Sequence, residues 1–159
     1  MRGWRDEDFG PWAEICADDE VMRALGREGG IAPDAAWREM AIFAGHWVLK
    51  GFGHWVLEER SSGELVGRAG LYYPPDWPGL EVGWTIARSR WGEGLATEAG
   101  RAAADWAHDV LGARHIISLI EPANTRSIRV AEKLGMTEEG ATELRGHSLR
   151  VYGSELPLG

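Results

Sequence analysis

A glycine loop lies between a predicted strand and a predicted helix, at residues 92–97. The first N–H groups of a helix have no partner inside the helix, and together with the helix dipole they suit a phosphate group. Glycine has no Cβ, so the backbone there can approach a pyrophosphate closely. The predicted phosphate-binding residues are Gly92, Glu93, Gly94, Leu95, Ala96 and Thr97.

This loop departs from two other phosphate-binding patterns. A Walker loop ends in Gly-Lys-Ser/Thr, whereas this loop continues from Gly94 as Leu-Ala-Thr, without the lysine. A Rossmann fingerprint is G-x-G-x-x-G after the first strand of a parallel sheet, whereas this one is G-x-G-x-A after a predicted antiparallel meander. Taken alone, the loop leaves one alternative open, a turn that serves only as a connection.

Two residues near the loop are candidates for proton transfer. Glu81 lies in an otherwise apolar predicted strand, where a carboxylate can act as a general base, and its alternative role is to face solvent or pair with Arg68 across the meander. Ser127 lies one helical turn after Asn124, where its hydroxyl could donate a proton. Its alternative role is that of an early-helix serine bonded to the backbone. Glu143 is a reserve base.

Hydrophobic periodicity, glycines and prolines predict the elements that position these residues. The order is two short helices, a long helix, three antiparallel strands, and then a strand between two helices and two final strands. This pattern predicts a mixed α/β sheet. The expected helices span about 6–16, 19–25, 33–49, 97–111 and 125–134, and the expected strands span 54–59, 65–73, 80–87, 115–120, 136–144 and 149–156.

Length and composition limit the class of protein. The 159 residues predict one domain over 1–159, and a net charge of −8 argues against a nucleic-acid-binding surface. The single cysteine, Cys16, excludes an internal disulfide, and the histidine spacing predicts no metal site. No apolar run is long enough for a membrane span, and the first 20 residues are too acidic for a signal peptide. We therefore expect a cytoplasmic protein with no membrane partner.

Three motifs follow one another along the second half of the chain. They are Glu81-Val-Gly-Trp-Thr-Ile86, Trp91-Gly-Glu-Gly-Leu-Ala-Thr-Glu-Ala99 and Glu121-Pro-Ala-Asn-Thr-Arg-Ser-Ile-Arg-Val-Ala-Glu-Lys-Leu-Gly135. In this order they resemble the GNAT-type N-acetyltransferases, and within them the RimJ/RimL-like branch that acetylates ribosomal-protein N-termini. The resemblance covers nearly the whole chain and implies a twisted mixed sheet of six or seven strands flanked by about four helices.

The resemblance implies acetyl-CoA as the acetyl donor and a primary amine, either a protein N-terminus or a small molecule, as the acceptor. The loop N–H groups would hold the pyrophosphate, and Asn124 would hydrogen-bond the pantetheine where the central strands splay. Glu81 would act as the base through water, and Ser127 would donate to the departing thiolate. A homodimer is compatible with this interpretation. The strand residues whose backbone would pair with the pantetheine arm are Trp84, Thr85 and Ile86.

The chain departs from the family pattern in two places that bear on function. Many members have a tyrosine general acid where this chain has Ala131, and the family's first strand is reduced here to residues 1–4. Cys16 is remote from the motifs, so we expect direct attack without a covalent enzyme intermediate. The alternative functions are a non-catalytic acyl-CoA-binding module and a small-molecule detoxifying acetyltransferase.

Overall fold

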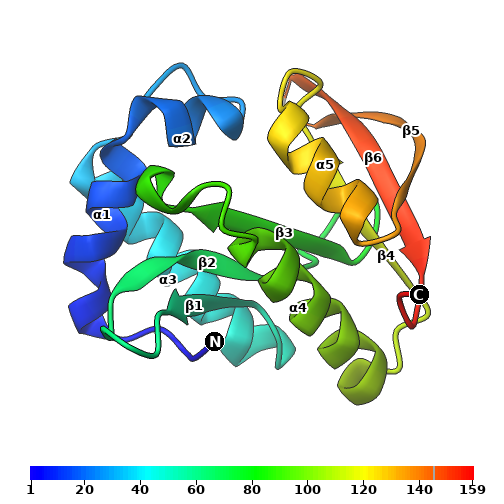
Figure 1. The fold of residues 1–159 in the computed structure, drawn as a ribbon, viewed down its shortest axis with the longest axis horizontal. Helices are drawn as coiled ribbons and strands as arrows, with labels where there is room; N and C mark the ends of the chain where they lie inside the picture. The colour runs from blue at the N-terminus through cyan, green and yellow to red at the C-terminus, as the bar shows by residue number, and fades with distance from the viewer. Residues whose placement is uncertain (145) are drawn as a thin grey trace.

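The computed structural model describes residues 1–144 and 146–159, and in this part of the chain six strands form one sheet in the order β1-β2-β3-β4-β6-β5 (Figure 1). All neighbouring strands are antiparallel except β3 and β4, which are parallel. The predicted mixed α/β sheet is therefore confirmed. The strands are β1 (His54–Glu58), β2 (Leu65–Tyr72), β3 (Glu81–Ile86), β4 (His115–Ile120), β5 (Thr137–Leu144) and β6 (His147–Glu155).

Five α-helices occur in the described residues, one more than the family resemblance implied. All five expected helical segments are present, and the Asp18 side chain starts the second one directly after the first by accepting hydrogen bonds from the N–H groups of Glu20 and Val21. None of the described helices is long and apolar enough to cross a membrane. The helices are α1 (Phe9–Ala17), α2 (Asp19–Ala24), α3 (Pro33–Lys50), α4 (Leu95–Leu111) and α5 (Thr125–Lys133), with 3-10 turns at Asp6–Asp8 and Arg88–Arg90.

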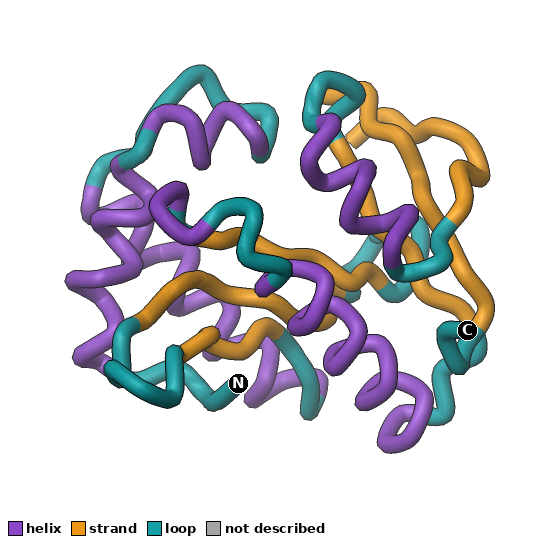
Figure 2. The backbone as a smooth tube through the Cα atoms, in the orientation of Figure 1, coloured by secondary structure: helices purple, strands orange, loops and turns teal. Residues whose placement is uncertain are grey.

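The sheet lies between two helical layers (Figure 2). Because side chains alternate along a strand, Leu71 of β2 and Val82 of β3 pack toward α4 and α5, while Val56 of β1 packs toward α1 and α3. The buried face of α4 consists of alanines and one glycine, which lets the helix lie close to the sheet. The core therefore has two halves, and the polar residues of β2 and β3 face the α1 and α3 side.

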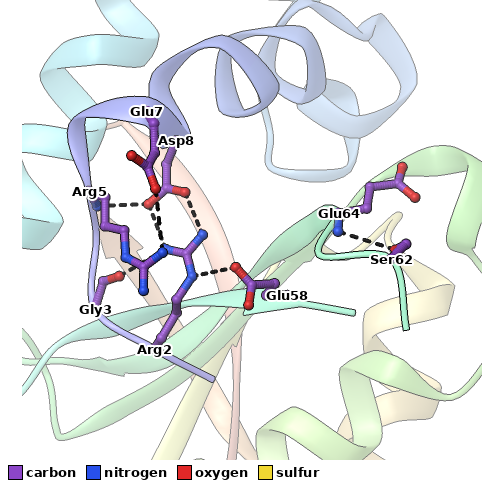
Figure 3. A network of polar contacts seen from close by, with 8 residues as sticks. All are labelled: Arg2, Gly3, Arg5, Glu7, Asp8, Glu58, Ser62 and Glu64. Atoms are coloured by element: carbon purple, nitrogen blue, oxygen red, sulfur yellow. Dashed lines mark hydrogen bonds and ion pairs between the residues drawn. The ribbon is translucent and has the colours of Figure 1, made fainter. Parts of the chain in front are cut away.

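In residues 1–4, where the first strand was expected, one residue pairs with the sheet and is surrounded by ion pairs. Arg2 makes a single antiparallel bridge with Val56, and its guanidinium binds Asp8 at 2.7 and 2.8 Å and Glu58 at 2.6 Å (Figure 3). Burial alone would raise the pKa of Asp8, but hydrogen bonds from Arg2 and from the Arg5 N–H outweigh it and lower that pKa. The N-terminal segment is thus held to β1 by the two backbone hydrogen bonds between Arg2 and Val56 and by the Arg2–Glu58 ion pair.

Candidate active site

The parallel strands β3 and β4 pair at only one position, Glu81 with Ile117, and then diverge. Side chains satisfy the backbone at the point of divergence. The Ser118 hydroxyl donates to the Val82 carbonyl at 2.6 Å, and the Leu119 N–H donates to the Glu81 carboxylate. The ladder therefore ends without leaving these groups unpaired, and Glu81 sits at the opening.

Beyond the opening, β3 has a free backbone edge. The backbone N–H and C=O groups of successive strand residues point to opposite edges, so those of Trp84 and Ile86 point to the same edge as those of Val82, while those of Thr85 point to β2. Trp91 Nε1 donates to the Ile86 carbonyl at 2.9 Å. The open edge therefore consists of the Trp84 backbone groups and the Ile86 N–H.

A cavity of about 460 Å³ runs along this edge to the start of α4. Gly92 and Gly94 both have left-handed φ, +88° and +85°, and a Cβ added at either would meet nothing within 4 Å. The first helical N–H groups follow Gly94, so the helix begins at the cavity wall. Glu93 is the one predicted cofactor residue that does not line this cavity, and its carboxylate binds Arg90 at 3.0 Å.

Three cations on α5 line the same cavity and were missed by the sequence analysis: Arg126, Arg129 and Lys133. Their i, i+3, i+7 spacing places them on one helix face, and this was the available signal. The Arg126 guanidinium lies 4.3 Å from the centre of the Trp91 ring. No carboxylate of the described residues lies within 4.0 Å of any of the three cations. The cavity therefore offers positive charge beside the glycine loop.

A second cavity, of about 350 Å³, lies on the other side of the opening and contains Glu81. The Glu81 carboxylate accepts a hydrogen bond from Trp77 Nε1 at 2.7 Å. Burial raises the pKa of Glu81 to about 7, although the hydrogen bond from Trp77 and the charge of Arg68 oppose the rise. A carboxylate whose pKa lies near neutral pH is suited to act as a general base.

Trp84, Asn124 and Ser127 line both cavities and so mark where the two meet. The Ser127 hydroxyl accepts from Trp84 Nε1 at 3.3 Å and from Asn124 Nδ2 at 2.9 Å. With both lone pairs engaged, its proton remains available for donation. Asn124 also donates to the Ala24 carbonyl at 2.7 Å, which ties the end of α2 to the start of α5 (Figure 1).

The other residues singled out from the sequence lie away from this junction or differ in role. Glu143 is exposed on β5 and lines neither cavity. Ala131 is fully buried in the core. Burial raises the pKa of the Cys16 thiol to about 11, which disfavours a thiolate nucleophile. The alternative role of Glu81, an ion pair with Arg68, is not found: both residues line the second cavity, but no ion pair within 4.0 Å joins them in the described chain.

The splayed parallel pair, the glycine loop and the two joined cavities leave room for one molecule on each side of the opened sheet. A family model for the acetyltransferase (GNAT) domain matches residues 1–137. The chain therefore belongs to the GNAT acetyltransferase family, as the sequence motifs predicted.

Individual proteins resemble this chain over part or most of its length. YkkB of Bacillus subtilis, an uncharacterized protein, is 38% identical over 91 residues, which span 55% of this chain and 53% of that protein. This chain thus matches about half the length of that relative. A crystal structure of an Agrobacterium tumefaciens acetyltransferase superposes with a TM-score of 0.85 at 27% identity, covering 96% of this chain and 88% of that one.

A third similar protein is yncA of Salmonella typhimurium, solved with its cofactor acetyl-CoA. It has a TM-score of 0.76 at 20% identity and covers 99% of this chain and 94% of that one. At this identity the similarity establishes a common fold.

Proposed function

We propose that this chain transfers the acetyl group of acetyl-CoA to a primary amine by direct attack. One observation carries the proposal: the two cavities meet at Ser127, and Glu81, with a pKa near 7, lies in one of them. Acetyl-CoA would supply an acetyl thioester, which is activated toward an amine. The yncA complex supports acetyl-CoA as the donor.

The first cavity has the donors that this molecule requires. The N–H groups of the glycine loop and the start of α4 suit a pyrophosphate, and the open space at Gly92 and Gly94 permits its close approach. Arg126, Arg129 and Lys133 would neutralise its phosphate charges. The Trp84 backbone N–H and carbonyl would pair with the amide groups of the pantetheine arm, as an added strand does.

Glu81 would remove the proton that the amine must lose. An α-amine has a pKa near 8 and arrives mostly protonated at neutral pH, so a base with a pKa of about 7 can accept its proton directly or through water. Ser127 would hydrogen-bond the leaving group with its available proton. The strand N–H of Ile86 would stabilise the oxyanion.

Asn124 would act mainly by holding Ser127 in place. Its Oδ1 accepts from the Ser127 N–H at 3.0 Å, and its Nδ2 donates to Ser127 Oγ and to the Ala24 carbonyl. These bonds cap α5 and orient Ser127. The expected hydrogen bond from Asn124 to pantetheine would require the Ala24 bond to be exchanged.

Placement in the RimJ/RimL-like branch, cytoplasmic location and a homodimeric state are parts of this proposal that rest on the sequence alone. The non-catalytic acyl-CoA-binding module is the second candidate, because Ala131 removes the tyrosine acid of many relatives. The pKa of Glu81 favours the enzyme over this module, since a binding module has no need of a near-neutral carboxylate beside the junction.

A thiol-release assay with acetyl-CoA and a panel of primary amines tests the proposal. We expect release that depends on both substrates. Tight acetyl-CoA binding by calorimetry without release for any acceptor would instead support the binding module. Absence of acetyl-CoA binding would contradict both candidates.

A further inference from the structure

The second cavity contains an unpaired cation as well as Glu81. The Arg68 guanidinium lies 4.5 Å from the centre of the Phe43 ring and donates from Nη1 to His54 Nδ1 at 2.8 Å. Its Nε is buried and has no hydrogen-bond partner among the described residues. Arg27, which lines the same cavity, instead forms an ion pair with Glu39. The two arginines therefore differ in whether the protein itself supplies an anion.

No protein anion balances the charge of Arg68 at close range. Within the described chain no carboxylate comes within 4.0 Å of it. Burial lowers the pKa of Arg68 to about 10, so the side chain stays charged at neutral pH. Burial and the nearby Arg68 hold the pKa of His54 well below its usual range, so this imidazole is neutral. A half-buried cation whose close contacts are neutral, and which feels the charge of Glu81 only from beyond 4.0 Å, is costly unless an anion reaches it.

The sheet leaves room between Arg68 and Glu81. Tyr72 of β2 lies opposite Glu81 of β3, Gly70 lies opposite Gly83, and Arg68 lies opposite Thr85. Opposite residues share a face, so Gly83, which lines the cavity, forms a floor between the carboxylate and the guanidinium. A Cβ at Gly83 would lie 3.3 Å from His54 Cε1 and 3.7 Å from Glu81 Oε1, which places both side chains around this floor.

From this arrangement we propose that the acceptor is a small amine that also carries a carboxylate, with its amine at Glu81 and its carboxylate at Arg68. The inference rests on the proposed function and names the substrate class of the same site. Arginine pairs with carboxylates through charge-assisted hydrogen bonds, which are about twice as strong as neutral ones. Trp77 and Tyr72 supply an aromatic wall, with ring centres 5.1 Å apart. A cavity of about 350 Å³ is of the size that takes a small molecule such as a free amino acid.

Matched acceptors test the carboxylate directly. Each set consists of an amino acid, its methyl ester and the amine left after removal of the carboxylate, and the sets cover α-, β- and γ-amino acids. We expect kcat/KM for at least one carboxylated member to exceed that of its ester by about tenfold or more, because a hydrogen bond to a charged group is worth that much. Esters or decarboxylated amines that are equal or better substrates throughout would overturn the inference. Dipeptides with an acidic second residue form another arm, and a preference for them would place the carboxylate on a peptide.

Variants at Arg68 separate recognition from structure. Arg68→Met keeps the length and the packing on Phe43 but removes the charge. We expect it to reduce the ratio of kcat/KM between acid and ester, whereas any change that acts through the pKa of Glu81 affects both acceptors alike. Arg27→Met is the matched control in the same cavity, and we expect it to retain the preference because Arg27 already has Glu39. An equal loss for acid and ester in Arg68→Met, with wild-type folding, would assign Arg68 a structural role only.

A binding measurement distinguishes this inference from the proposed function. Trp77 and Trp84 line the second cavity, so tryptophan fluorescence reports its occupation. We expect the preferred amino acid to change the fluorescence of the protein in the presence of CoA, and Arg68→Met to abolish the change. Binding of this kind without acetyl transfer would contradict the proposed function and would show only that the second cavity holds a carboxylated amine. Transfer to amines without any preference for the carboxylate would support the proposed function and contradict the inference about the substrate class.

Discussion

Replacing Glu81 by glutamine should affect activity and stability in opposite directions. The amide keeps the shape of the side chain but cannot accept a proton, so we expect kcat to fall by about 10²–10⁴. The rise of the wild-type rate with pH, centred near the Glu81 pKa of about 7, should disappear in the variant. Binding of acetyl-CoA should change little, since Glu81 lines the second cavity and not the first.

The stability effect follows from the same pKa. The folded protein holds the proton of Glu81 up to about pH 7, whereas the unfolded chain releases it near 4.5. The unfolded state therefore binds fewer protons between these values, and the free energy of unfolding falls as pH rises from 4.5 to 7. Each pKa unit is worth about 1.4 kcal/mol, so the decline from Glu81 reaches at most about 3 kcal/mol. Glu81→Gln should lack this decline.

Urea unfolding of both proteins at pH 4.5 and at pH 8 measures the effect, together with pH–rate profiles. The difference in unfolding free energy between variant and parent should shift in favour of the variant as pH rises. Glu121→Gln is a matched control, because Glu121 lines the same cavity, and it should keep the acid limb of the rate profile. A Glu81→Gln enzyme within about threefold of the parent at all pH values would refute Glu81 as the base, since a general base contributes far more.

Three further predictions concern the loop, the junction and the N-terminus. Gly94→Ala should weaken acetyl-CoA binding in calorimetry by about tenfold or more. Gly112→Ala, at the other end of α4 with φ +66° and equally open space, should introduce similar backbone strain without this loss. Equal weakening in both variants would show that the loop does not belong to the cofactor site. Ser127→Ala should lower kcat by about tenfold or less with an unchanged acetyl-CoA dissociation constant, since a thiolate with a pKa near 8.5 needs little acid assistance, and an unchanged kcat would count against its role. Arg2→Met should destabilise the protein at pH 7 by about 3 kcal/mol in urea unfolding, because Asp8 would remain as a buried charge. Because its pKa is lowered, ionised Asp8 stabilises the folded protein above the ordinary carboxyl range, and this stabilisation is lost as pH falls. The destabilisation caused by Arg2→Met should therefore shrink in acid, and a destabilisation that does not depend on pH would contradict the prediction.

Local sequence was sufficient for the elements and for the glycine loop. The boundaries of helices and strands agree with periodicity and breaker residues to within about three residues, because those signals act over a few neighbouring positions. The loop at Gly92 and Gly94 was likewise visible, since a strand, two glycines and a helix in succession require no distant contact. The family assignment rested on three such local motifs and is confirmed.

Only the tertiary structure decided which side chains share a cavity. Arg68 and Glu81 are thirteen positions apart in sequence, and the register of β2 on β3, with Gly70 opposite Gly83, brings them to the two sides of one hollow. The cations of α5 lie beside the glycine loop only because α5 and α4 flank the same opening. The pKa of Glu81 depends on the burial that this packing creates. Side-chain environments of this kind are sums over contacts distant in sequence, and no local pattern encodes them.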